Sequence, residues 1–394
     1  MMDLSAKPQE SHLRARALRV ATVAAAHADD VDKVGRFPRE AVEEMKAAKL
    51  MGIMIPVELG GEGLSTSEIA EICTIIGQAC ASSAMIFAMH QIKVSSLVSH
   101  GQDAAWHRDF MRRVASEQLL LGSATTEAGI GGNMRNSICA IEVKDGRCYL
   151  EKDATVISYG IDCDAILITS RSHKDAASSD QVMTVFLKDQ YTLEHTQSWD
   201  TLGMRGTCSD GFIFKGEAPA EQILPQPFAE IAAQSMLASA HLLWSALWYG
   251  IAVDAFSRAQ NFVRAAARKS PGTQPPGLVQ LAEMSSQLQV VRANIVNGLQ
   301  AFEAARKDQD RLSSMGFAVA MNNVKIASSE MILPIINQAM RICGILGYKN
   351  GTPYSLGRHL RDAHSAELMI SNDRILANTS TMLLVHKQET GLLG

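Results

Sequence analysis

Apolar residues recur with a helical period along the first part of the chain. Segment 65–80, STSEIAEICTIIGQAC, places three isoleucines and a cysteine on one helical face, directly after the candidate capping residues 65–67. Segment 37–52, FPREAVEEMKAAKLMG, begins near a proline, carries its glutamates early and its lysines late, and stops at Gly52. These features are typical of helices, so residues 4–118 are predicted to be largely helical.

The period of the pattern shortens to two in the middle of the chain. Segment 138–152, ICAIEVKDGRCYLEK, predicts two strands joined at Asp145-Gly146, a dipeptide favoured by tight hairpins. Further runs rich in β-branched or aromatic residues follow between polar turns: AILITSR (165–171), VMTVFLKD (182–189) and GFIFKG (211–216). These runs indicate a β domain.

Helical periods return after Pro225 and Pro227 and continue almost to the end of the chain. The order of helices, strands and then helices predicts an α+β fold rather than an alternating βαβ fold. We expect an N-terminal helical domain (1–118), a middle β domain (119–226) and a C-terminal helical bundle (227–394).

One stretch, 231–253, carries no formal charge over about the length that crosses a bilayer. A helix that is apolar nearly all round also fits the centre of a large helical domain. Because polar residues interrupt the stretch, we expect a buried helix and no membrane span. The interrupting residues are Gln234, Ser235, Ser239, His241 and Ser245.

Composition and charge exclude several classes of protein. The 394 residues carry a formal net charge of -4, and no basic excess indicates a nucleic-acid partner. The seven cysteines are scattered, without a C-x-x-C pair or a histidine at zinc-ligand spacing, so we expect reduced thiols and no metal site. The N-terminus lacks the apolar core of a secretory signal, which predicts a cytoplasmic protein.

A Gly-rich loop, SATTEAGIGGN (123–133), is the first candidate binding element. Its backbone N–H groups and hydroxyls could reach a flat heterocycle or a phosphate, although glycines mark ordinary turns more often than ligand sites. No G-x-G-x-x-G motif follows a strand and no P-loop is present, so a Rossmann or NTPase interpretation has no support.

Six segments occur in an order that carries a family resemblance. They are TTEAGIGGN (125–133), VISYG (156–160), LGMRGTCSDGFIF (202–214), ARKSPG (267–272), RICGILGY (341–348) and HLRDA (359–363). Together they resemble the acyl-CoA dehydrogenase superfamily of FAD flavoenzymes. The resemblance implies an N-terminal helical domain, a β-barrel-like middle domain and a C-terminal four-helix bundle, assembled as a homotetramer or homodimer.

The resemblance also implies which residues hold the flavin ring. Thr125 and Thr126 match the Thr-Glu motif that hydrogen-bonds the ring, and Ser158 matches the hydroxyl placed beside flavin N5. Hydrogen-bond donors at these positions stabilise the charge on a reduced flavin. Val156 replaces the Trp that lies over the flavin in the family, so the shape of the flavin pocket is expected to differ.

Three further residues match the family's contacts with the FAD pyrophosphate. Arg268 matches an Arg that reaches a neighbouring subunit's FAD, and Gly344 and Gly347 match glycines that let the backbone approach the dinucleotide. Other motif positions depart from the family pattern and make the CoA contacts uncertain, with Arg135 or Arg341 as alternative phosphate ligands. The departures are Ala128, Gly132, Asn133, Pro271, Arg341 and Ile345.

Family dehydrogenases remove the α-proton of an acyl thioester with a glutamate at a fixed interval after Arg-Asp-Ala. Counted from Arg361, that glutamate falls on Ile370. The alternative position on an earlier helix falls on Ala240 or His241, neither of them a carboxylate. Glu367 and His241 are candidate substitutes for the base, with His364 as a further one.

Three functions therefore stay open. The first is an FAD-dependent oxidoreductase that α,β-dehydrogenates an acyl-CoA or other acyl thioester with a displaced or absent base. The second is a flavin-dependent monooxygenase that uses O2 on a CoA ester or another small molecule, in which the apolar Ile370 shelters the reaction from water. The third is a non-catalytic FAD-binding protein.

Overall fold

The computed structural model describes residues 8–131, 133–387 and 391, and its elements follow the predicted order of helices, strands and helices. The remaining residues of the two predicted outer domains, 1–7 and those after 387 other than 391, lie outside the described part. The leading helices are α1 (Pro8–Val34), α2 (Arg39–Ala47), α3 (Thr66–Ala79), α4 (Ala81–His100) and α5 (Ala105–Glu117). Short 3₁₀ turns lie at Val57–Leu59, Lys188–Gln190, Arg205–Thr207 and Ala220–Gln222.

The strands form two open sheets rather than a closed barrel within the part of the chain that the structure describes. In the three-stranded sheet, β4 pairs in parallel with β1 and antiparallel with β5. In the antiparallel four-stranded sheet the order is β2-β3-β7-β6. The strands are β1 (Leu121–Ala124), β2 (Glu142–Lys144), β3 (Arg147–Ala154), β4 (Ala165–Arg171), β5 (Gln181–Leu187), β6 (Tyr191–Gln197) and β7 (Gly211–Pro219).

The hairpin expected at Asp145-Gly146 is confirmed. Lys144 pairs with Arg147, and the two residues between them have φ values of 50° and 76°. A type I′ turn requires positive φ at both central positions, which Asp and Gly tolerate better than other residues. The local sequence therefore fixes the register of β2 against β3.

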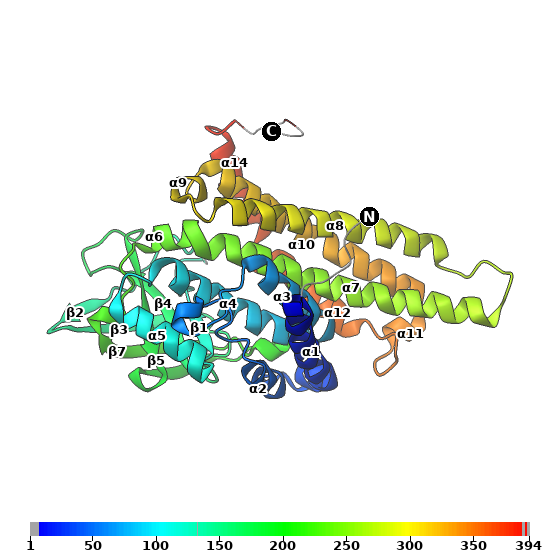
Figure 1. Ribbon diagram of the computed structural model, residues 1–394, viewed down its shortest axis with the longest axis horizontal. Coiled ribbons are helices and arrows are strands. Elements are labelled where there is room, and N and C mark those ends of the chain that lie inside the picture. Colours follow the sequence, from blue (N-terminus) through cyan, green and yellow to red (C-terminus); the bar gives the residue numbers. More distant parts are fainter. Residues whose placement is uncertain (1–7, 132, 388–390, 392–394) are drawn as a thin grey trace.

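The C-terminal part is helical. A π-helical turn (Ala232–Met236) leads into α7 (Leu237–Lys269), and α7, α8 and α10 pack on one another while α14 packs on α10. These long helices extend away from the end of the molecule that holds the strands (Figure 1). The elements are α6 (Phe228–Ile231), α8 (Leu278–Ala305), α9 (Gln309–Leu312), α10 (Met315–Cys343), α11 (Ile345–Tyr348), α12 (Gly357–Ala363), α13 (Ser365–Leu368) and α14 (Asn372–Leu383).

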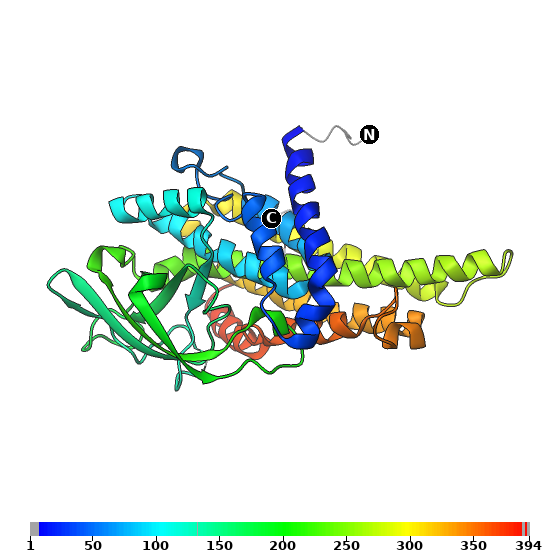
Figure 2. The same cartoon turned by 90° about the horizontal axis from the view of Figure 1, so that it is seen from below.

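The uncharged stretch expected to form a buried helix is at the centre of the fold. The helix Phe228–Lys269 is long and apolar enough to cross a membrane by composition, but 83% of its most apolar window is buried inside the protein. It packs against α3, α4, α8 and α10, and α1 crosses the direction of the long helices (Figure 2). The stretch is therefore a core helix, as its interrupting polar residues predicted.

The predicted end of the second helix was wrong. The helix α2 ends at Ala47, and Lys49 then turns the chain with a φ of 57°. Gly52 instead marks a close approach, because a Cβ there would lie 2.4 Å from the Cα of Ala115 in α5. The sequence signal at Gly52 came from tertiary packing rather than from a helix end.

The predicted cap of α3 is confirmed and gives a first testable prediction. The Ser65 side chain accepts from Glu68 N, and the Glu68 carboxylate accepts from Ser65 N at 2.8 Å. We expect Ser65→Ala to lower the free energy of unfolding by about 1 kcal/mol, measured by chemical denaturation. Ser67→Ala is the matched control on the same turn, and an equal loss in both variants would contradict the cap.

Candidate active site

A large cavity lies between the helices and the sheets. Its volume is about 1050 Å³, larger than the roughly 300 to 1,000 Å³ of pockets for drug-sized ligands. The wall is mainly apolar and comes from α4, the loop after β1, the segment before β7, the start of α7, and α12 to α14. The cavity therefore joins all three predicted domains, and it has room for a flat cofactor ring together with a substrate.

Hydroxyl groups form one wall of the cavity. Thr125 and Thr126 come from the loop after β1, and Ser158 follows β3. Thr126 Oγ1 donates to the Val156 carbonyl at 3.1 Å, and Ser158 Oγ lies 2.8 Å from Ser209 Oγ. Thr126 Oγ1 is thereby left as an acceptor, while the hydroxyls of Thr125 and Ser158 can donate or accept, so this wall can hydrogen-bond the edge of a polar heterocycle.

Glu127 anchors the loop that carries this wall. Its carboxylate accepts from Ser137 Oγ at 2.8 Å, Ile138 N at 3.0 Å and Cys139 N at 2.6 Å, and Lys152 Nζ lies 3.9 Å away. Burial alone would raise the pKa of Glu127, but these hydrogen bonds and the Lys152 charge outweigh it and lower the pKa below the usual range. The carboxylate is thus a structural clamp and is turned away from the cavity.

Two of the motif segments, LGMRGTCSDGFIF and HLRDA, touch each other at the cavity. Met204 N donates to the buried Asp362 Oδ1 at 2.7 Å, and Arg361 forms an ion pair with Asp32 of α1. A Cβ on Gly203 would lie 2.2 Å from the Arg361 carbonyl oxygen, so only glycine fits there. Burial raises the pKa of Asp362 to about 6. The contacts of the adjacent residues Arg361 and Asp362 thus fix the segment that leads to Ile370.

Ile370 lines the cavity and has an unusual backbone. Its φ is 48°, a left-handed conformation that is rare for a β-branched residue. The fully buried Lys325 of α10 donates from Nζ to the Ile370 carbonyl at 2.9 Å and to Asn372 Oδ1. Burial lowers the pKa of Lys325 to about 8. This lysine holds the turn between α13 and α14 in place.

His241 also lines the cavity, with its imidazole buried. Its Nδ1 lies 3.2 Å from the Met321 carbonyl, so Nδ1 must carry the proton that it donates and Nε2 is left as an acceptor. Nε2 has no partner among the described residues. Burial lowers the pKa of His241 to about 4, so the imidazole is neutral at neutral pH and is a weak base.

The ionisable residues of the cavity wall share one property. Among the described residues that line the cavity, none is Asp or Glu, and the ionisable ones are all basic. They are Lys93, Arg135, His241, Arg361, His364 and Arg374. The wall can therefore attract negative charge, but it offers no carboxylate to remove a proton from a substrate.

Four predicted site residues do not line the cavity. Glu367 is exposed on α13, and Arg268 is exposed at the end of α7, far along the chain from the cavity-lining residues of that helix. Gly344 has a φ of 56° at the end of α10, and Gly347 is buried where a Cβ would lie 2.8 Å from Cys343 Cβ. Gly132, a departure from the loop motif, lies outside the described residues.

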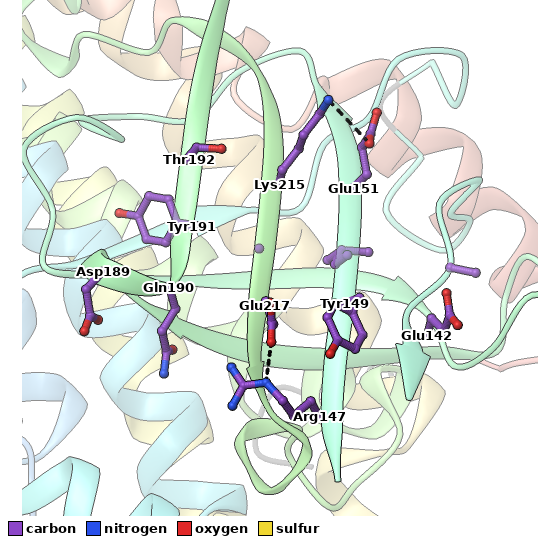
Figure 3. Close-up of a pocket in the computed structure, with 13 residues that line it drawn as sticks. Glu142, Arg147, Tyr149, Glu151, Asp189, Gln190, Tyr191, Thr192, Lys215 and Glu217 are labelled. Carbon is purple, nitrogen blue, oxygen red and sulfur yellow. Dashed lines mark hydrogen bonds and ion pairs between the residues drawn. The ribbon is translucent and has the colours of Figure 1, made fainter. Parts of the chain in front are cut away.

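A second hollow lies on the outward face of the four-stranded sheet and has a volume of about 970 Å³ (Figure 3). Two ion pairs cross its strands: Arg147 with Glu217, and Lys215 with Glu151 at 3.6 Å. Alternate residues of β3 face this side and are exposed. Because four of its six charged residues are in ion pairs and the side chains lie on an exposed strand face, this hollow is an ordinary sheet face and not the candidate site.

Comparison with known proteins agrees with this architecture. The family model "Acyl-CoA dehydrogenase, N-terminal domain" matches residues 7–118, and "Acyl-CoA dehydrogenase, C-terminal domain" matches residues 231–379. The chain belongs to the acyl-CoA dehydrogenase family. Members of this family are flavin-dependent oxidoreductases that include dehydrogenases and monooxygenases.

Individual relatives within the acyl-CoA dehydrogenase family have different chemistries. The glutaryl-CoA dehydrogenase of Desulfococcus multivorans is 27% identical over 85% of this chain and 86% of its own. The butyryl-CoA dehydrogenase of Megasphaera elsdenii superposes with a TM-score of 0.83 at 18% identity, over 97% of this chain and 100% of its own. The FMN-bound dibenzothiophene monooxygenase TdsC of a Paenibacillus species also reaches 0.83, at 19% identity, over 96% and 98%.

Two buried lysines that the sequence interpretation missed are Lys93, which lines the cavity, and Lys325, which holds the Ile370 turn. Lys93 is the one Lys, Arg, Asp or Glu in α4, a helix otherwise made of apolar residues, serines, two histidines and a glutamine. Such an isolated charge within an apolar helix is a signal that could have been read, because a buried charge is costly unless it has a use. Lys325 gives a weaker signal, because α10 also carries Glu330 and Arg341.

Proposed function

We propose that this member of the acyl-CoA dehydrogenase family is an FAD-dependent monooxygenase acting on a small, largely apolar molecule. One observation carries the proposal: the described wall of the cavity offers hydroxyls and cations but no carboxylate base. Thioester dehydrogenation needs such a base, which contributes on the order of 100- to 10,000-fold. Oxygen transfer by a reduced flavin does not.

The donor set of the cavity fits a flavin ring. Thr125, Thr126 and Ser158 would hydrogen-bond its polar edge, and the room of about 1050 Å³ accommodates a ring together with a substrate. When bound, the flavin supplies two-electron redox chemistry and, once reduced, reactivity towards O2. FAD rather than FMN is proposed because Arg268, Gly344 and Gly347 match the family's pyrophosphate contacts.

The residues around Ile370 would exclude water from the reacting part of the cavity. Met369 and Ile370 present apolar side chains to the cavity, and Lys325 fixes their turn from behind. A water-excluded site prevents hydrolysis and proton leakage during a reaction with O2. The neutral His241 remains available to orient a substrate.

A second candidate is α,β-dehydrogenation of an acyl thioester. The 27% sequence identity to glutaryl-CoA dehydrogenase supports it. In that case the base would be the unpartnered Nε2 of His241, since Glu367 is exposed and does not line the cavity. The low pKa of His241 makes it a poor base, so this candidate ranks second.

One experiment separates the two candidates. The purified FAD-loaded protein is titrated without O2 against a panel of acyl-CoAs while flavin absorbance is followed. We expect no rapid bleaching. The flavin is then reduced chemically and mixed with isotopically labelled O2 and a panel of aromatic compounds, and labelled product is sought by mass spectrometry.

Free reduced FAD at the same concentration is the control, because it consumes O2 without transferring oxygen to the panel. Labelled product from the protein alone supports the monooxygenase proposal. Rapid anaerobic bleaching by an acyl-CoA would overturn it in favour of dehydrogenation. A protein that binds FAD but gives neither result would point to the non-catalytic role.

A further inference from the structure

A buried lysine lines the cavity without a carboxylate partner. Lys93 lies on α4, its side chain is 4% exposed, and it continues the cavity-facing stripe of Met85 and Met89 at a spacing of four residues. The hydrogen bond that its Nζ makes runs to Met236 Sδ at 3.2 Å. A thioether is a weak acceptor, whereas an ammonium group has three protons to donate.

The adjoining segment, which packs directly on α4, adds two more polar atoms without partners among the described residues. Met236 ends the π-helical turn before α7, and His241 and Trp244 follow at positions of α7 that also line the cavity. Trp244 Nε1 and His241 Nε2 are buried and have no hydrogen-bond partner among the described residues. Trp244 Nε1 is a donor and His241 Nε2 is an acceptor. Lys93 Nζ thus has a weak acceptor, and the two α7 atoms have no partner among the described residues.

The other cations of the cavity are not equivalent to Lys93. Arg361 is paired with Asp32, while Arg135 and Arg374 are exposed to solvent. Buried charges in proteins are normally paired, because an unpaired one loses its hydration without compensation. A methionine would fill the position of Lys93 at lower cost, so packing alone does not account for the lysine.

We propose that Lys93 recognises an anionic oxygen, a carboxylate or a phenolate, on the otherwise apolar substrate of this cavity, with Trp244 Nε1 as a second donor. This inference shares one assumption with the proposed function, namely that the substrate binds in this cavity. It narrows the substrate class from small apolar molecules to those with an acidic oxygen at one end.

Proton uptake on binding should accompany this recognition. Burial lowers the pKa of Lys93 to about 7, and a bound anion would raise it again, so the complex gains a proton near neutral or mildly basic pH. His100 on α4 and His241 on α7 have pKa values lowered by burial to about 4, and both stay neutral there. The arginines stay charged, and His364 is exposed.

The test measures binding to the FAD-loaded protein by titration calorimetry. The probes are benzoate and its neutral analogue benzamide, and then 4-nitrophenol and nitrobenzene, which distinguish a carboxylate from a phenolate. We expect an anion to bind tighter than its neutral analogue. Lys93→Met should weaken anion binding by about 10- to 100-fold, the range of a charge-assisted hydrogen bond, and change the neutral analogue less than threefold.

Lys215→Met on the exposed sheet face is the matched control and should leave all four affinities unchanged. Repeating the benzoate titrations in buffers of different ionisation enthalpy should show proton uptake in the wild type and none in Lys93→Met. Equal binding of charged and neutral probes to the wild type would overturn the inference even if Lys93→Met failed to fold. Anion binding that survives when acyl-CoA bleaches the flavin would uphold the inference while the monooxygenase proposal fails.

Discussion

Glu127→Ala is expected to lower the free energy of unfolding by about 3 to 5 kcal/mol, the usual loss when one partner of a buried ion pair is removed. The carboxylate accepts hydrogen bonds from Ser137, Ile138 and Cys139, all of which would lose their acceptor. Lys152, only 1% exposed, would be left without its counter-charge. Chemical denaturation at neutral pH measures this loss.

The same variant should also weaken FAD binding, because Thr125 and Thr126 belong to the loop that Glu127 anchors. Glu142→Ala is the matched control, since Glu142 is exposed on β2 of the same region and should change stability by less than about 0.5 kcal/mol. If Glu127→Ala unfolded with the same denaturant midpoint as the wild type, the carboxylate of Glu127 would not be needed to hold the loop.

Ile370→Glu is expected to give the largest gain in thioester chemistry. It places a carboxylate at the family's base position, on the wall of a cavity that otherwise has none among its described residues. General-base catalysis contributes on the order of 100- to 10,000-fold, so anaerobic reduction of the flavin by acyl-CoA should become at least about 100-fold faster. Stopped-flow absorbance of the flavin measures the rate.

Ile370→Gln is the control, because it has nearly the shape of the glutamate variant and cannot take up the α-proton. It should reduce no faster than wild type. In contrast, the oxygen transfer of both variants should fall, since each brings a polar group into the apolar wall. Equal reduction rates in the Glu and Gln variants would mean that position 370 does not reach the substrate's α-carbon.

The sequence predicted the fold well because the signals were local. The hairpin depended on two adjacent residues, Asp145 and Gly146, and the α3 cap on Ser65 and Glu68. The end of α2 was predicted wrongly because Gly52 is a glycine for another reason. It lies too close to Ala115, more than sixty positions away along the chain, for a Cβ to fit. A one-dimensional pattern cannot separate these two uses of glycine.

The site was less predictable for the same reason. Motif resemblance led to Thr125, Thr126, Ser158 and Ile370, and the structure lines one cavity with all four. The roles of these residues stay predictions. Glu367 lies one turn from Ile370 in sequence yet outside the cavity wall, because the side a helical residue faces depends on how α13 packs. Several elements together form the cavity wall, so the sequence of one element does not tell whether that wall contains a carboxylate.

The left-handed backbone at Ile370 stores strain in the wall of the cavity. An L-residue in that conformation costs roughly 1 to 2 kcal/mol, and a glycine would avoid the cost. Strained backbone persists only where the surrounding structure over-determines it. The buried Lys325, which donates to the Ile370 carbonyl, is one such constraint, so the fold spends stability to hold residue 370 in this turn at the cavity wall.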